Sequence, residues 1–178
     1  MKYMGEMLLT RAPFSEIVMG NTALVRAMIE AGTRVVTSYP GSPTPEIATA
    51  IQSIAPERRP FHFEFSTNEK VATEVALGAS LNGYLSTVFF KSVGLNVAAD
   101  PFINSSITGV NGGFIVTVAD DPSMHSSQDE QDSRFYGQFA MIPILEPSNQ
   151  QEAYDMVHYG FDLSERLKLP VMLRVTTR

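Results

Sequence analysis

The sequence contains no cysteine. Without a thiol, the chain cannot form a disulfide scaffold, a thiolate zinc site or an iron–sulfur cluster, and it has no cysteine nucleophile. Any such group in a reaction that involves this protein must be held by another domain or chain.

Basic residues and long apolar runs are also scarce. The 13 Lys and Arg residues are outnumbered by 19 Asp and Glu residues, giving a formal net charge of -6, and no basic run stands out. Nucleic acids and anionic membranes both require a clustered basic surface, so neither is an expected partner. No apolar run approaches the ~20 residues of a membrane span, and the first residues lack the apolar core of a signal peptide. We therefore expect a cytoplasmic protein.

The chain does have the length and hydrophobicity of one packed domain. It has 178 residues, of which 44% are hydrophobic and 18% are charged, which excludes a disordered chain. Residues 1–15 show no clear pattern and are predicted to form an irregular arm. Residues 16–178 are predicted to form the domain.

Apolar strand-like runs alternate with helical segments throughout 16–178. The alternation, with strands that are almost wholly apolar, predicts an α/β fold of three layers in which helices cover both faces of a mostly parallel six-stranded sheet. In such sheets ligands bind beyond the carboxyl ends of the strands, so the loops that follow strands are candidate sites. The predicted strands are 34–39, 61–66, 86–92, 112–120, 141–147 and 170–177, and the predicted helices are 21–32, 47–54, 68–83, 95–110 with a break near Pro101, 129–139 and 148–169.

Two helix starts carry capping signals. Asn21 or Thr22 is expected to cap the first helix, because both side chains can accept a hydrogen bond from an unpaired backbone N–H. Ser148 and Gln151 have the spacing of a capping box and are expected to open the last helix.

The loop after the first strand is stiff and brings a hydroxyl to the sheet edge. It reads Tyr39-Pro40-Gly41-Ser42 and continues through Pro43, Thr44 and Pro45. Its prolines restrict the backbone, and Gly41 allows a ligand to approach closely. From the residues alone, a rigid turn with Ser42 or Thr44 as a helix N-cap is the simpler interpretation. The loop is not a phosphate-binding loop, because it lacks the glycine spacing and the lysine.

Glu69 stands where the second strand ends and the next helix begins. Ser66 and Glu69 fit a capping box, and the helix dipole also favours a carboxylate in a first turn. The alternative is a carboxylate directed into the crevice above the sheet. Glu74 lies roughly 500° further around the helix and is assigned instead to an ion pair with Lys70.

The loop after the most apolar strand is dense in polar residues. Residues 120–134 contain His125, Arg134 and several carboxylates. Their spacing matches no metal signature, so no metal ligand is expected, and no Ser–His–Asp arrangement is evident. A solvated loop with Ser127 or Asp129 as a helix cap explains the same residues. Composition and spacing therefore predict a ligand crevice but no particular reaction.

The same loops resemble those of a known family. Residues 18–178 are similar to the pyrimidine-binding domain of the thiamine-diphosphate-dependent 2-oxoacid:ferredoxin oxidoreductases, and most similar to the indolepyruvate (arylpyruvate) type. The string at 120–134 is specific to this family, whereas the Tyr-Pro-x-(Ser/Thr)-Pro loop is shared more widely. The matching motifs, in order, are Gly20-Asn21-x-Ala23, Tyr39-Pro40-Gly41-Ser42-Pro43, Asn68-Glu69-Lys70-Val71-Ala72, Lys91-Ser92-Val93-Gly94-Leu95-Asn96, Asp120-Asp121-Pro122 and His125-Ser126-Ser127-Gln128-x-Glu130-Gln131-Asp132-Ser133-Arg134.

The resemblance implies roles for individual residues. Glu69 would bond the ring nitrogen of the cofactor's aminopyrimidine, beside the loop Tyr39-Pro40-Gly41-Ser42. Ser42 and Arg134 would contact the carboxylate and keto group of the substrate, with His125 as a further polar contact or proton donor. A guanidinium suits a 2-oxoacid carboxylate because it can bind it through two parallel hydrogen bonds.

The resemblance also implies partners. Asn111-Gly112-Gly113 is not the G-D-G…N motif that holds magnesium diphosphate, so Mg²⁺ and the diphosphate would be held by a partner domain. Iron–sulfur clusters would likewise lie in partner domains. The substrates would be a 2-oxoacid and coenzyme A, with ferredoxin as electron acceptor, in a hetero- or homo-oligomer. The chain would be either a split subunit or an excised domain.

Two other functions stay open. One is the alpha chain of a non-oxidative, thiamine-dependent 2-oxoacid decarboxylase of the sulfopyruvate type, a class that also uses short chains without cysteine. The other is a non-catalytic interaction domain of the same fold. The presence of Glu69, Ser42 and Arg134 argues against the second.

Overall fold

The computed structural model describes residues 2–12 and 15–177 and shows the expected alternation of strands and helices. In chain order the elements are α1 (Lys2–Leu9), α2 (Gly20–Ala31), β1 (Val35–Ser38), α3 (Pro45–Gln52), a short 3-10 helix (Pro56–Arg58), β2 (His62–Phe65), α4 (Glu69–Leu81), β3 (Ser86–Lys91), α5 (Ser92–Thr108), β4 (Phe114–Asp120), α6 (Arg134–Ala140), β5 (Ile144–Leu145), α7 (Gln150–Leu167) and β6 (Val171–Thr176).

The strands form one six-stranded sheet in the order β2-β1-β3-β4-β6-β5. Every neighbouring pair is parallel, so the predicted α/β fold is confirmed. All seven residues of β4 are buried, as expected for a strand with neighbours on both sides and helices on both faces. Among the described residues no helix is both long and apolar enough to cross a membrane.

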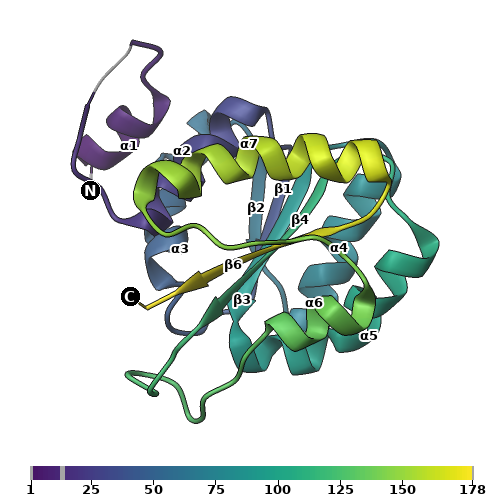
Figure 1. Cartoon of the computed structure of the whole chain (residues 1–178). Coiled ribbons are helices and arrows are strands. Elements are labelled where there is room, and N and C mark those ends of the chain that lie inside the picture. The colour runs from purple at the N-terminus through teal and green to yellow at the C-terminus, as the bar shows by residue number, and fades with distance from the viewer. Residues whose placement is uncertain (1, 13–14, 178) are drawn as a thin grey trace.

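Helices cover the sheet in two layers (Figure 1). α1, α2, α3 and α7 lie on one face, and α4, α5 and α6 lie on the other. Because successive strand residues point to opposite faces, neighbours in β3 belong to different cores. Phe89 packs in the core beneath α2, α3 and α7, whereas Val88 and Phe90 pack in the core beneath α4 and α5.

The prediction of an irregular N-terminal arm is wrong, because residues 2–9 form the helix α1. Leu8 is fully buried in the core beneath α2, and Met4 and Met7 pack against the same cluster. Arg26 of α2 donates from Nη1 to the carbonyls of Met7 (3.1 Å) and Leu8 (2.9 Å). These carbonyls have no partner within a helix that ends at Leu9, so the guanidinium acts as a C-terminal cap from another helix.

Two elements that contain or border a proline differ from the prediction. α5 does not break at Pro101 but continues through it to Thr108. Burial of Leu95 and Phe102 on either side offsets the roughly 3 kcal/mol cost of an internal proline. In contrast, the last-but-one strand shrinks from 141–147 to the two residues of β5, which are followed by Glu146 and Pro147.

Two predicted helix caps are wrong. Asn21 lies inside α2 and makes no cap bond; the N-cap is Met19. The box that opens α7 is shifted by one residue, because Asn149 Oδ1 accepts from the Glu152 N–H (2.9 Å) and Glu152 accepts from the Ser148 N–H (2.7 Å).

We expect Leu8→Ala to lower the free energy of unfolding by about 2–5 kcal/mol, because it removes a fully buried side chain and leaves a cavity. Denaturant unfolding of the full chain measures this. Leu81→Ala is the matched control, since Leu81 is 44% exposed and its loss should change stability by less than about 1 kcal/mol. Equal, small effects of the two substitutions would show that α1 is not part of the core.

Candidate functional site

The strand order places a topological switch point between the carboxyl ends of β1 and β3. The chain leaves β1 toward β2 and leaves β3 toward β4, so the direction of winding reverses between these two neighbours. Loops diverge at such a switch point and leave room for a ligand. The hydroxyl of Ser38 donates to the Phe89 carbonyl (2.7 Å) and holds the two strand ends together.

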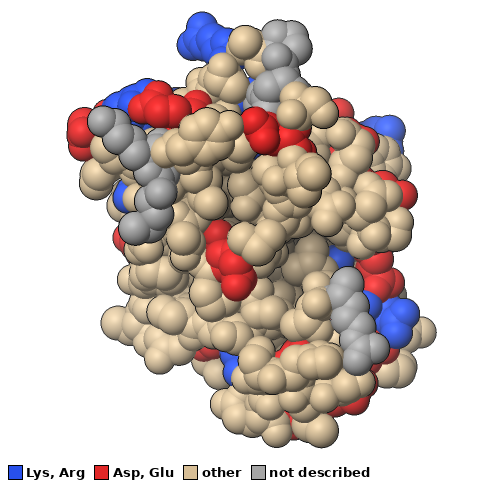
Figure 2. Space-filling model, turned by 90° about the vertical axis from the view of Figure 1, so that its left-hand side faces the viewer, with Lys and Arg blue, Asp and Glu red and all other residues tan. Residues whose placement is uncertain are grey.

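Figure 2 shows the face of the molecule at which the strands end. Most of its middle is uncharged apart from one acidic side chain, and other Lys, Arg, Asp and Glu side chains lie mainly toward its rim. Two large apolar side chains, Tyr39 (38% exposed) and Phe65 (42% exposed), come from the ends of β1 and β2. This face therefore has the mixed character of a surface that can be covered by another domain.

The loop after β1 is fixed by its own hydrogen bonds. Both the N–H (3.0 Å) and the hydroxyl (2.7 Å) of Thr44 donate to the Gly41 carbonyl. Asn21, reaching from α2, donates to the Pro43 carbonyl (3.1 Å). Thr44 is the N-cap of α3 by position, but its hydroxyl serves the loop. Ser42 is half-buried and its hydroxyl makes no hydrogen bond with any described residue, so it remains available as a donor.

Glu69 is not part of a capping box. It is the first residue of α4, and the N-cap is Asn68, whose Oδ1 accepts from the Val71 N–H (2.9 Å). The Glu69 residue is only 7% exposed. Its carboxylate makes no hydrogen bond or ion pair with any described residue, and its oxygens are not among the fully enclosed polar atoms, so water or a ligand can reach them.

Gly94 provides the room for this carboxylate. A Cβ at position 94 would lie 2.7 Å from Oε1 and 2.8 Å from Cγ of Glu69, closer than real Cβ contacts. Gly94 belongs to the first turn of α5, so Glu69 lies beside the N-termini of two helices. Their partial positive charge and unpaired N–H groups favour a negative side chain.

The loop after β4 is organised by Asp121. This carboxylate accepts from the N–H groups of Ser126 (2.7 Å), Ser127 (2.8 Å) and His125 (3.1 Å). These hydrogen bonds, led by the one from Ser126, hold the pKa of Asp121 well below its usual range. They also delay the next helix, so α6 begins at Arg134 rather than near residue 129, and its N-cap is Ser133 rather than Ser127 or Asp129. The His125 residue is exposed on this loop.

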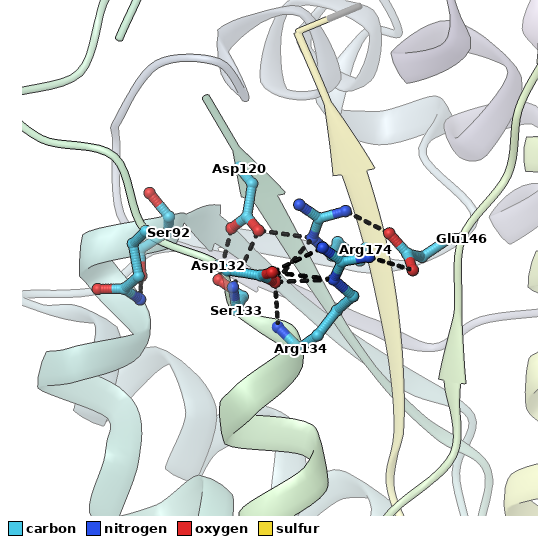
Figure 3. A network of polar contacts seen from close by, with 8 residues as sticks. Ser92, Asp120, Asp132, Ser133, Arg134, Glu146 and Arg174 are labelled. Carbon is cyan, nitrogen blue, oxygen red and sulfur yellow. Dashed lines mark hydrogen bonds and ion pairs between the residues drawn. The ribbon is translucent and has the colours of Figure 1, made fainter. Parts of the chain in front are cut away.

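Arg134 belongs to a network of ion pairs at the end of β4 and β6 (Figure 3). Asp132 binds its guanidinium in bidentate fashion, with Nε–Oδ1 at 2.8 Å and Nη2–Oδ2 at 2.6 Å. The carboxylate of Glu146 lies 3.8 Å from its Nη1. Arg134 is half-exposed, and both carboxylates raise its pKa, with the Asp132 hydrogen bond as the largest cause.

The buried half of the network is built on Asp120 and Arg174. Asp120 is fully buried and accepts from Arg174 Nε (2.5 Å) and from the Ser133 N–H (2.9 Å), while Arg174 also pairs with Glu146. Burial lowers the pKa of Arg174, but the hydrogen bonds and charges of Asp120 and Glu146 together raise it by more, so this guanidinium stays charged. The network thus anchors the start of α6, and with it Arg134, to the sheet.

Two further contacts tie the 121–133 loop to the end of β3. Lys91 Nζ donates to Gln128 Oε1 (2.5 Å), and Gln131 Nε2 donates to the Ser92 carbonyl (2.8 Å). The structure therefore brings the Ser42 loop, Glu69 and the 121–133 loop to one edge of the sheet, as the sequence predicts. Arg134, in contrast, is engaged with carboxylates on the β5 and β6 side.

The sequence interpretation gave no role to Lys91, Gly94 or Arg174. A lysine at the end of the apolar run Ser86–Lys91 and a single arginine in the apolar run Val171–Thr176 are the signals that could have found two of them. Within residues 2–12 and 15–177, no group of three or more His, Asp or Glu side chains is placed to hold a metal ion.

Comparisons with known proteins identify the family and the fold. Residues 26–176 match the family described as pyruvate flavodoxin/ferredoxin oxidoreductase, thiamine diphosphate-binding. The indolepyruvate oxidoreductase subunit IorA of Methanothermobacter marburgensis is 52% identical over 161 residues, which are 90% of this chain and 26% of that protein. The corresponding IorA of Archaeoglobus fulgidus is 49% identical over 164 residues, again 90% of this chain and 26% of that protein.

A solved structure shares the fold. The 2-oxoglutarate:ferredoxin oxidoreductase from Magnetococcus marinus, with 2-oxoglutarate, coenzyme A and succinyl-CoA bound, matches with a TM-score of 0.77 at 19% identity. The match covers 94% of this chain and 32% of that one. The chain spans about a quarter of the length of the IorA relatives.

The Asp132–Arg134 pair predicts a measurable titration. The hydrogen bond from Arg134 lowers the pKa of Asp132 from 3.8 to about 2. A lowered folded-state pKa means that the Asp132 charge stabilises the fold above the ordinary value and that this contribution is lost as the pH falls through about 2.

Carbon NMR of the Asp132 carboxyl in the full chain should therefore give a midpoint near 2, which moves toward 3.8 in Arg134→Ala. A wild-type midpoint near 3.8 would show that the two side chains are not paired in solution.

Proposed function

The chain belongs to the thiamine-diphosphate-binding family of pyruvate flavodoxin/ferredoxin oxidoreductases, and from that premise we propose that it forms the pyrimidine-binding part of an indolepyruvate-type 2-oxoacid:ferredoxin oxidoreductase. The proposed reaction is oxidative decarboxylation of a 2-oxoacid with coenzyme A, giving acyl-CoA, CO₂ and reduced ferredoxin. The identity of about half to IorA proteins supports the indolepyruvate type over the sulfopyruvate type.

The single observation that carries the proposal is the unpartnered carboxylate of Glu69. The residue is only 7% exposed and no described residue binds its carboxylate, while the carboxylate oxygens are not fully enclosed, so their hydrogen bonding is left to water or a ligand. A neutral heterocycle with a ring nitrogen fits this need, because a carboxyl group and a ring nitrogen can share one proton. The site residues therefore fit the aminopyrimidine of thiamine diphosphate.

Bound thiamine diphosphate supplies the carbanion chemistry that decarboxylation requires. The chain's part is to hold and orient. Glu69 holds a proton at the ring nitrogen of the aminopyrimidine, and Gly94 keeps the space beside the carboxylate clear. The loop Tyr39-Pro40-Gly41-Ser42 forms the wall on the β1 side, where its hydrogen bonds keep it rigid before the cofactor binds.

The proposed substrate contacts come from donors at the carboxyl edge of the sheet. The unengaged Ser42 hydroxyl is proposed to donate to the keto oxygen of the 2-oxoacid. Arg134 is proposed to face the carboxylate, although Asp132 already binds its fork, so the substrate shares this guanidinium rather than receiving all its donors. His125, on the exposed part of the 121–133 loop, is proposed as a proton donor.

The remaining groups are assigned to partners. A second domain or chain is proposed to hold Mg²⁺ and the diphosphate, and an iron–sulfur subunit to pass electrons to ferredoxin. The weakly charged middle of the carboxyl edge in Figure 2 supports contact with the diphosphate-binding partner there. We place the assembly in the cytoplasm as an oligomer.

The reaction itself is tested by mixing the assembly with indolepyruvate and coenzyme A and following reduction of a low-potential acceptor. Without reduction the proposed oxidative reaction fails.

Glu69→Gln separates a chemical role from a structural one. Gln has the same shape but cannot share a proton in the same way, so turnover of the assembly should fall by about 100-fold or more. Exchange of the thiamine diphosphate C2 proton, followed by NMR, should slow in parallel. The unfolding midpoint should stay the same, because no described residue binds the Glu69 carboxylate and the substitution breaks no contact within the chain.

Glu74→Gln is the matched control, since Glu74 lies on the same helix but is exposed and paired only weakly with Lys70 at 3.9 Å. It should leave turnover and C2 exchange at the wild-type level. Full activity in Glu69→Gln, with unchanged C2 exchange, would remove Glu69 from the mechanism.

A further inference from the structure

Lys91 occupies the switch point of the sheet itself. It is the last residue of β3 and the N-cap of α5, so its side chain starts between the Ser42 loop and the 121–133 loop. A Cβ at Gly41 would lie 2.5 Å from Lys91 Cδ and 2.8 Å from Cγ. The aliphatic stem of Lys91 therefore packs directly on the Gly41 backbone.

The Lys91 ammonium has a neutral partner, whereas Arg134 and Arg174 at the same edge pair with carboxylates. Within the described residues, Nζ bonds only the neutral amide oxygen of Gln128, at 2.5 Å. Arg134 is bound by Asp132 and faces Glu146, and Arg174 is bound by Asp120 and Glu146. Among Lys91, Arg134 and Arg174, only Lys91 has no ion pair with a described carboxylate.

We propose that Lys91 binds the carboxylate of the 2-oxoacid, and this inference rests on the proposed function. An ammonium without an anionic partner gains more from a substrate carboxylate than a guanidinium whose fork is already occupied. Neither Asp132 nor Glu146 has to be displaced for Lys91 to act. Arg134, whose fork Asp132 already binds, then makes the weaker second contact with the same carboxylate.

The surroundings of Lys91 prepare it for this contact. The stem is confined on Gly41 and the tip is held by Gln128, so little rotamer freedom is lost when an anion binds. Gly94, which contacts Glu69, follows Lys91 by three residues and lies in the first turn of α5. The proposed carboxylate site and the proposed cofactor site therefore share one short segment of the chain.

The test compares Lys91→Met with Arg134→Ala in the complete assembly. Met keeps the stem that packs on Gly41 and removes only the charge. With indolepyruvate as substrate, Lys91→Met should raise KM by about ten- to a hundredfold and change kcat much less, as expected for a lost charge-assisted hydrogen bond. Arg134→Ala should raise KM by a smaller factor. Affinity for thiamine diphosphate should be unchanged in Lys91→Met.

A second pair of measurements keeps the result clear if Lys91→Met assembles poorly. Gln128→Glu would give Lys91 a carboxylate partner and should also raise KM for indolepyruvate. Indole-3-propionate, which has the carboxylate but no keto group, should inhibit the wild-type assembly competitively and bind at least about tenfold more weakly to either variant.

The failures are distinguishable. A wild-type assembly that turns over indolepyruvate, together with unchanged KM in Lys91→Met and Gln128→Glu, overturns the role of Lys91 and leaves the proposed function standing. A larger KM effect in Arg134→Ala than in Lys91→Met also overturns it. A wild-type assembly that does not oxidise indolepyruvate overturns the proposed function, and the inference with it.

Discussion

The close approach of Glu69 to Gly94 is the contact on which the site depends. It lets the first residue of α4 place a carboxylate under the first turn of α5, where a side chain at position 94 would collide with it. Two helix N-termini favour the negative charge at this position, and no described residue binds the carboxylate. The Glu69 carboxylate therefore suits a ligand that can share a proton with it or donate one to it.

Everything around this contact is rigid. Below this contact, β1 and β3 pair as neighbouring parallel strands, and the Ser38 hydroxyl donates a further hydrogen bond to the Phe89 carbonyl. A separate hydrophobic core lies on each face of the sheet. On one side Asn21 and Thr44 fix the loop after β1, and on the other Asp121 fixes the loop after β4. The groups that meet at the switch point are therefore held in place before any ligand arrives, which reduces the entropy lost on binding.

The strands could be predicted from the sequence because apolar runs covered on both faces, such as Phe114–Asp120, have few other structural solutions. Helix caps could not, because Ser66 and Asn68, or Ser148 and Asn149, compete for the same role and only the backbone geometry decides. α1 was missed because its end is capped by Arg26, a contact between separate elements.

Long-range pairing limits prediction of the site in the same way. Asp120 and Arg174 are 54 residues apart and meet only because β4 and β6 are neighbours. Identification of Glu69 as a candidate was possible from its place at a strand end, but its lack of a partner is a property of the folded chain.

The most direct test is a structure of the complete assembly with thiamine diphosphate bound. We predict a Glu69 carboxylate oxygen at about 2.6–3.2 Å from the aminopyrimidine ring nitrogen, whereas a ring nitrogen beyond hydrogen-bonding reach, or bonded to another residue, would contradict the account.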